Sequence, residues 1–125
     1  MQTAQTVVLI IVALAFLGMG GYALAAPAAL ARPFHLRADT PPGRSEIRAV
    51  YGGFGLAIAA VLAVAALDLA ETRRGVVVTV AAALAGMAVG RLVSRLLDAP
   101  VAFYPIWLYF WIETLAAAAL FATLI

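Results

Sequence analysis

Three polar side chains that could do chemistry, Tyr51, Arg91 and Glu113, lie inside long apolar segments. A guanidinium in hydrocarbon costs at least roughly 2.5 kcal/mol, so Arg91 is expected to face a protein interior or a water-filled cavity. Guanidiniums bind anions, carboxylates orient guanidiniums, and a tyrosine hydroxyl donates a hydrogen bond. The sequence therefore predicts a binding site for an anionic or polar-headed molecule, formed by Glu46, Arg48, Tyr51, Arg91, Ser94, Arg95 and Glu113.

The helical repeat brings several of these residues to one face and to one level. Arg91, Ser94, Arg95 and Asp98 stand at i, i+3, i+4 and i+7 and share one helix face. If successive segments run in opposite directions, a rise of about 1.5 Å per residue puts Arg91 roughly 10 Å, Glu113 roughly 12 Å and Tyr51 roughly 9 Å below the same membrane surface. We therefore expect an Arg91–Glu113 ion pair, hydrogen-bonded by Tyr51, in a cavity that opens toward the first and third loops. The alternative is that this pair only fastens the third segment to the fourth.

The composition restricts the chemistry and indicates a membrane protein. Hydrophobic residues make up 66% and charged residues 11% of the 125 residues, far from the balance of soluble proteins. The chain has no cysteine, no lysine and a single histidine, His35. Thiol nucleophiles, thiolate metal sites, Schiff bases and paired histidine ligands to haem are therefore excluded. We predict no cofactor, no catalytic residue and no nucleic-acid surface, and we assign no enzyme class.

Four apolar segments of about twenty residues predict four transmembrane helices. The expected fold is an all-α, up-down-up-down four-helix bundle that forms a single domain over residues 1–125, with the lipid bilayer as its surroundings. The expected spans cover residues 6–26, 45–67, 75–98 and 104–125, with a polar loop at 27–44. A cleaved signal peptide is the competing interpretation of the first segment, but it lacks a positive leading region.

Small residues predict where the helices pack. Ala82, Gly86, Gly90 and Ser94 recur at four-residue spacing, which is typical of close helix contacts in membranes. We expect this stripe to carry Arg91 and Arg95 to the interior of the bundle. Further packing stripes are predicted at Gly55, Ala59 and Ala63 and at the glycines that end the first segment.

The remaining predictions concern helix ends and the opposite half of the membrane. Ser45, after Pro-Pro-Gly, is a candidate N-cap of the second helix. The short turn at residues 68–74 is expected to be solvated, and the half of the bundle beside it to consist only of apolar residues. Five arginines flank the first and third loops against two in this turn, which favours a cytoplasmic pocket mouth and external termini. Without Arg48 and Arg95, which the site would use, the count is three arginines against two and favours neither orientation of the protein in the membrane.

The stretch from Arg44 to Gly53, together with Gly90-Arg91-Leu-Val-Ser94 and the acidic residue of the last helix, carries a family resemblance. The chain resembles small four-helix bacterial membrane proteins grouped as a domain of unknown function and is similar in architecture to DoxX-type proteins. Its most specific residues are Glu46, Arg48, Tyr51, Gly52 and Gly53. The resemblance implies a multi-pass protein of the bacterial inner membrane and implies no activity.

Three functions remain open. The first is binding of a lipid or another lipophile with a polar head, with Glu113 and Tyr51 as acid–base groups if any reaction occurs. The second is an accessory or structural subunit that packs against a membrane-protein partner or a second copy. The third is proton-coupled transport, although small multidrug resistance transporters carry their glutamate in the first helix, where this chain has no charge.

Overall fold

The computed structural model describes residues 2–125, and within that range the chain is helical with no strand. Its elements, in chain order, are α1 (Gln2–Ala25), α2 (Pro27–Ala31), η1 (Arg32–Phe34), α3 (Pro41–Ile47), η2 (Arg48–Gly53), α4 (Phe54–Ala66), η3 (Leu69–Glu71), α5 (Arg73–Leu97), η4 (Phe103–Trp107) and α6 (Leu108–Ala122). Because α3, η2 and α4 run on without a break in helical backbone angles, they act as one long helix.

Four of these helical stretches are long and apolar enough to cross a membrane. They are Thr3–Ala25, Pro41–Ala66, Arg73–Leu97 and Phe103–Ala122. The all-α prediction is therefore confirmed, and the chain has the helices of a multi-pass membrane protein. The second long helix begins earlier than predicted, at Pro41. Its N-cap is Thr40, whose Oγ1 accepts a hydrogen bond from the Gly43 amide at 3.2 Å, so the prediction of Ser45 as N-cap is wrong.

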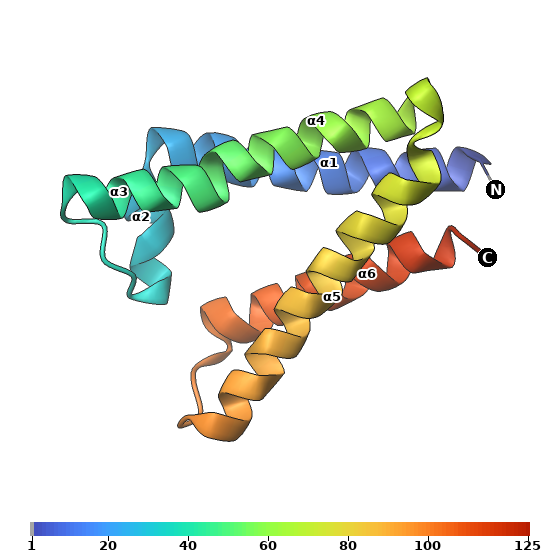
Figure 1. Ribbon diagram of the computed structural model, residues 1–125. Coiled ribbons are helices and arrows are strands. Elements are labelled where there is room, and N and C mark those ends of the chain that lie inside the picture. Colours follow the sequence, from blue (N-terminus) through green and yellow to red (C-terminus); the bar gives the residue numbers. More distant parts are fainter. Residues whose placement is uncertain (1) are drawn as a thin grey trace.

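The helices pack as two hairpins, α1 with α4 and α5 with α6 (Figure 1). Figure 1 shows the hairpins meeting at the end that holds both termini and the turn η3, and diverging toward the other end. We call the first the closed end and the second, which holds α2, α3 and η4, the open end. Polar residues of different hairpins therefore do not share one interior at the open end.

Apolar side chains from all four long helices form the core near the closed end. The fully buried members include Leu9 on α1, Leu62 on α4, Val77 on α5 and Leu120 on α6. Farther from the closed end, α1 and η2 of the first hairpin approach each other closely at glycine residues. A Cβ at Gly20 would lie 2.8 Å from the Gly52 carbonyl oxygen, so only glycine permits this α1–η2 contact.

The small-residue stripe of α5 does not pack inside the chain. Ala82, Gly86, Gly90 and Ser94 are all exposed. A Cβ added at Gly86 or Gly90 would meet no atom within 4 Å. The buried face of α5 instead carries Val77, Val80, Ala81, Leu84 and Ala88. The prediction that this stripe draws the arginines to the interior is therefore wrong, because α5 packs on α6 through its larger aliphatic residues.

Candidate functional site

Arg91 of α5 and Glu113 of α6 form the predicted ion pair. Arg91 Nε donates to Glu113 Oε1 at 2.6 Å, and Arg91 Nη2 donates to Oε2 at 3.0 Å. The Glu113 side chain is 5% exposed and that of Arg91 is 21% exposed. This two-bond geometry is the strong form of a charge-assisted hydrogen bond. The predicted Arg91–Glu113 ion pair is thereby confirmed.

Aromatic rings cover the arginine side of the pair. Arg91 Cζ lies 6.0 Å from the centroid of the Tyr109 ring, at the outer limit of a cation–π contact. The Phe34 ring of η1 lies 5.3 Å from the Tyr109 ring, so the first loop reaches the start of α6 at the open end. Tyr109 was missed in the sequence, although its position four residues before Glu113 places both on one helix face.

The pair leaves donors unused. Among residues 2–125, Arg91 Nη1 makes no hydrogen bond, and Arg95 makes neither a hydrogen bond nor an ion pair. Arg95 and Ser94 are exposed on the last turns of α5, nearer the open end than Arg91. The two arginines are balanced by two carboxylates, Glu113 and the α5 C-cap Asp98, so the free donors of Arg91 and Arg95 are the distinctive feature of this region and not its net charge.

The other three predicted site residues belong to the first hairpin. Arg48 donates from Nε to the Leu24 carbonyl oxygen at 3.1 Å, which ties η2 to α1. Tyr51 packs beside the buried cluster of Ala23, Ala31 and Ile47. Tyr51 makes no hydrogen bond with Arg91 or Glu113, so the predicted three-residue network is wrong. The divergence of the two hairpins explains the error.

Glu46 and Tyr51 line a separate, largely apolar cavity of about 360 Å³ at the open end. Its other walls come from the loop before α3 and from α3 and η2, namely Leu36, Arg37, Gly43, Ile47 and Val50. The predicted site thus consists of two parts on different hairpins. Arg91, Ser94, Arg95 and Glu113 form one part, while Glu46 and Tyr51 line the other.

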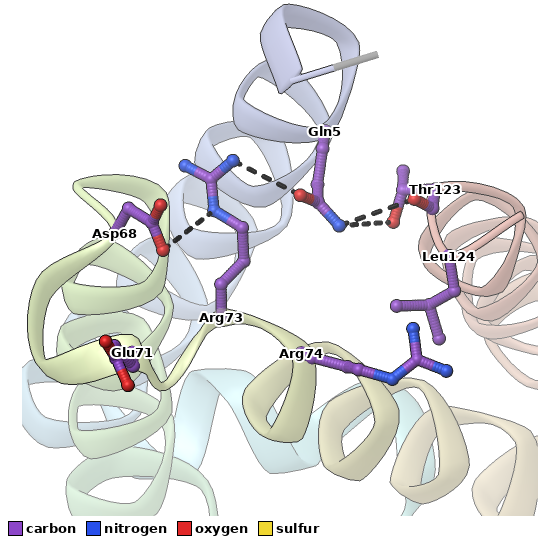
Figure 2. Close-up of a pocket in the computed structure, with 7 residues that line it drawn as sticks. All are labelled: Gln5, Asp68, Glu71, Arg73, Arg74, Thr123 and Leu124. Atoms are coloured by element: carbon purple, nitrogen blue, oxygen red, sulfur yellow. Dashed lines mark hydrogen bonds and ion pairs between the residues drawn. The ribbon is translucent and has the colours of Figure 1, made fainter.

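The closed end holds a polar network that contradicts two predictions (Figure 2). The Arg73 side chain is only 11% exposed, lies 3.8 Å from Asp68 and reaches into the protein instead of being solvated. It donates to the carbonyl oxygens of Ala65 and Ala66 and to the side chains of Gln5 and Thr6. The half of the molecule beside the turn is therefore not purely apolar. Polar residues at both chain ends, Gln5 and Thr123, were the available signal.

No group of three or more metal-ligating side chains occurs in the part of the chain that the structure describes. The family described as Domain of unknown function (DUF4345) matches residues 4–124. No curated protein and no solved structure matches the chain.

Proposed function

Since the chain belongs to the family of the Domain of unknown function (DUF4345), whose description carries no activity, we propose a function from the residues of the open end: the protein binds an amphiphile with an anionic head in the bacterial inner membrane. Arg91 and Arg95 contact the head, Glu113 fixes Arg91, and the aliphatic part lies along the exposed face of the hairpin. The unused Nη1 donors of Arg91, with Arg95 one turn away, support this proposal most directly.

The depth of these donors favours an amphiphile over a soluble anion. Arg91 stands seven residues before Asp98, roughly 10 Å from the end of the span. At that depth, an acceptor that carries an apolar tail can enter the bilayer and stabilise the free edge of the guanidinium. Glu113 remains bonded to Arg91 on both oxygens, so the anion takes the opposite edge of the guanidinium. Ser94 adds a hydroxyl on the same helix end.

The two tryptophans of the chain provide the assay. Trp107 ends η4 and Trp111 lies in the first turn of α6, so both belong to the half of the second hairpin near the open end. Brominated phosphatidylglycerol should quench their fluorescence more strongly than brominated phosphatidylcholine of the same chain length. In Arg95→Gln we expect about a tenfold weaker preference, the factor that corresponds to 1.4 kcal/mol. Arg37→Gln removes one exposed charge of the first loop, outside the proposed site, and should leave the preference unchanged.

A second variant tests the buried donor without leaving a lone charge. The double change Arg91→Met, Glu113→Leu removes both members of the pair and should abolish the preference for the anionic lipid. If the double variant and Arg95→Gln both retain the wild-type preference, the proposal is wrong. Thermal unfolding of each variant in the same detergent shows whether the fold has been kept.

The exposed stripe on α5 favours a second candidate function, that of an accessory or structural subunit. Small residues permit the close helix approach found between membrane helices. Gly86 and Gly90 have open space before them, so a helix of a partner protein or of a second copy could approach there. Gly86→Leu and Gly90→Leu should then lower the mass of the complex in mild detergent. A wild-type protein that already has the mass of a monomer under these conditions would rule this function out.

Proton-coupled transport is the third candidate and has the least support. A carboxylate that binds transported protons has to be released from its arginine, whereas Glu113 is held on both oxygens by Arg91. Proton flux in liposomes that disappears in Glu113→Gln would favour transport over binding. Flux that does not respond to this change would end the idea.

A further inference from the structure

A second cavity lies at the closed end, between the turn that precedes α5 and the end of α6 (Figure 2). Its volume is about 370 Å³, which is at the lower end of the range for ligand pockets. It lies far from the open end, since Arg74 and Arg91 are separated by about 25 Å along α5. The lining residues are Gln5, Asp68, Glu71, Arg73, Arg74, Thr123 and Leu124.

One wall of this cavity is fixed by hydrogen bonds that join three helices. Arg73 Nη1 donates to Gln5 Oε1 at 3.2 Å. Gln5 Nε2 in turn donates to the carbonyl oxygen and to Oγ1 of Thr123, both at 3.4 Å. These bonds use the polar groups of Gln5 and hold α1, α5 and the end of α6 in register. The cavity is therefore a feature of the packed closed end and not of one loop.

The opposite wall carries two charges that the protein leaves free, those of Glu71 and Arg74, beside the Asp68–Arg73 ion pair. Glu71 and Arg74 are exposed, and neither forms a hydrogen bond or an ion pair through its side chain with any described residue. Asp68 is half exposed and only 3.8 Å from Arg73 Nε. Figure 2 shows Asp68 and Glu71 on the side of the turn, while Arg74 extends toward Leu124. Opposite charges thus stand at opposite ends of one cavity.

We propose that this cavity binds a zwitterionic head group that carries a phosphate and a primary amine. The phosphate contacts Arg74 beside the first turn of α5, where the positive end of the helix dipole adds to the attraction. The amine contacts Glu71, the carboxylate of this wall that has no arginine partner, whereas Asp68 pairs with Arg73. A single anion would leave these carboxylates facing it, and a simple cation would be repelled by Arg74. Because the cavity lies at the end of four membrane-length helices, a phospholipid head group can reach it from the bilayer.

Lipid retention in native mass spectrometry tests this proposal. The purified protein is mixed with phosphatidylethanolamine, phosphatidylglycerol and phosphatidylcholine of identical chains. In the Arg91→Met, Glu113→Leu background, in which the open end no longer selects phosphatidylglycerol, we expect phosphatidylethanolamine to be retained about tenfold more than the other two, which corresponds to one charge-assisted hydrogen bond. Glu71→Gln and Arg74→Gln should each remove the preference. Both side chains are exposed, so these variants should fold, and their thermal unfolding confirms it.

The controls separate this cavity from the open end and identify the source of the head group. In the wild-type background, Arg95→Gln, which weakens the anion site proposed above, should lower the retention of phosphatidylglycerol and leave the amount of phosphatidylethanolamine retained unchanged. Competition by soluble phosphoethanolamine at equal concentration would identify a free head group as the ligand, and selective lipid retention without competition would identify the lipid. Equal retention of the three lipids, or a preference that survives both Glu71→Gln and Arg74→Gln, would overturn the proposal. So would retention of phosphatidylglycerol that depends on Arg74 alone.

Discussion

Arg91 and Glu113 lie edge to edge between α5 and α6, with two hydrogen bonds of 2.6 and 3.0 Å and with the carboxylate almost fully buried. Neither residue is replaceable alone, because each neutralises the other in a segment apolar enough to cross a membrane. The pair links only α5 and α6, the two helices of the second hairpin. It does not bridge to the first, whose own polar residues bond elsewhere.

Breaking this pair from one side should destabilise the protein strongly. Arg91→Met or Glu113→Leu leaves one buried charge without its partner, and we expect a loss of about 3–5 kcal/mol in the free energy of unfolding. The double variant restores neutrality and should recover most of that loss. Unfolding by titrated denaturing detergent, followed by circular dichroism, gives the four free energies of the cycle. Single variants as stable as the wild type would show that water reaches the pair freely.

Arg73 should matter more for stability than its neighbour Arg74. Its side chain bonds to Gln5, Thr6 and two carbonyl oxygens of α4, whereas that of Arg74 makes no such bond among the described residues. Arg73→Met removes four hydrogen bonds of a largely buried guanidinium and should cost about 2–4 kcal/mol. Arg74→Met should change the stability by less than about 0.5 kcal/mol. The same unfolding titration compares the two, and equal effects would contradict the role of Arg73 at the closed end.

Glycines of the first hairpin and of α5 should respond oppositely to alanine. At Gly20 a Cβ would lie 2.8 Å from backbone atoms of Gly52 and Leu56, which cannot move aside cheaply. Gly20→Ala should therefore lower the Tm clearly. At Gly86 the new Cβ meets nothing within 4 Å, and alanine favours the helix by about 1 kcal/mol. Gly86→Ala should keep or raise the Tm of the monomer, and a large drop would show that another helix already occupies that face.

The membrane orientation can be tested cleanly because the chain has no cysteine. Arg73 is largely buried and bonded within the protein, so Arg74 is the one exposed arginine of the η3–α5 turn. Leaving out Arg95, which the proposed site uses, the open end still keeps Arg32, Arg37 and Arg48 exposed, and the positive-inside rule then favours a cytoplasmic open end. In whole cells, Leu69→Cys should react with an impermeant maleimide, and His35→Cys should react only after lysis. The reverse labelling pattern would show that the protein has the opposite orientation in the membrane.

The sequence by itself determined the helices and the level of the buried charges. Long apolar runs fix the spans because unpaired backbone groups are too costly in lipid, so helices are required. A constant rise per residue then makes depth countable, and for this reason the contact between Arg91 and Glu113 was predictable. Counting residues along a helix gives only the position of a side chain along the helix axis. It places Tyr51 at the same depth without saying which hairpin it belongs to.

The tertiary structure alone decided which residues at one depth are neighbours. Tyr51 packs in the first hairpin while Tyr109 stands beside Arg91, because the hairpins diverge toward the open end. The stripe at Gly86 and Gly90 signals a face suited to a helix, but the larger residues of α5 bury more apolar surface against α6 and turn that stripe outward. From the sequence, Arg73 is predicted to be a solvated turn residue. In the structure, Gln5 and Thr6, far away in the sequence, pack against it and accept its hydrogen bonds.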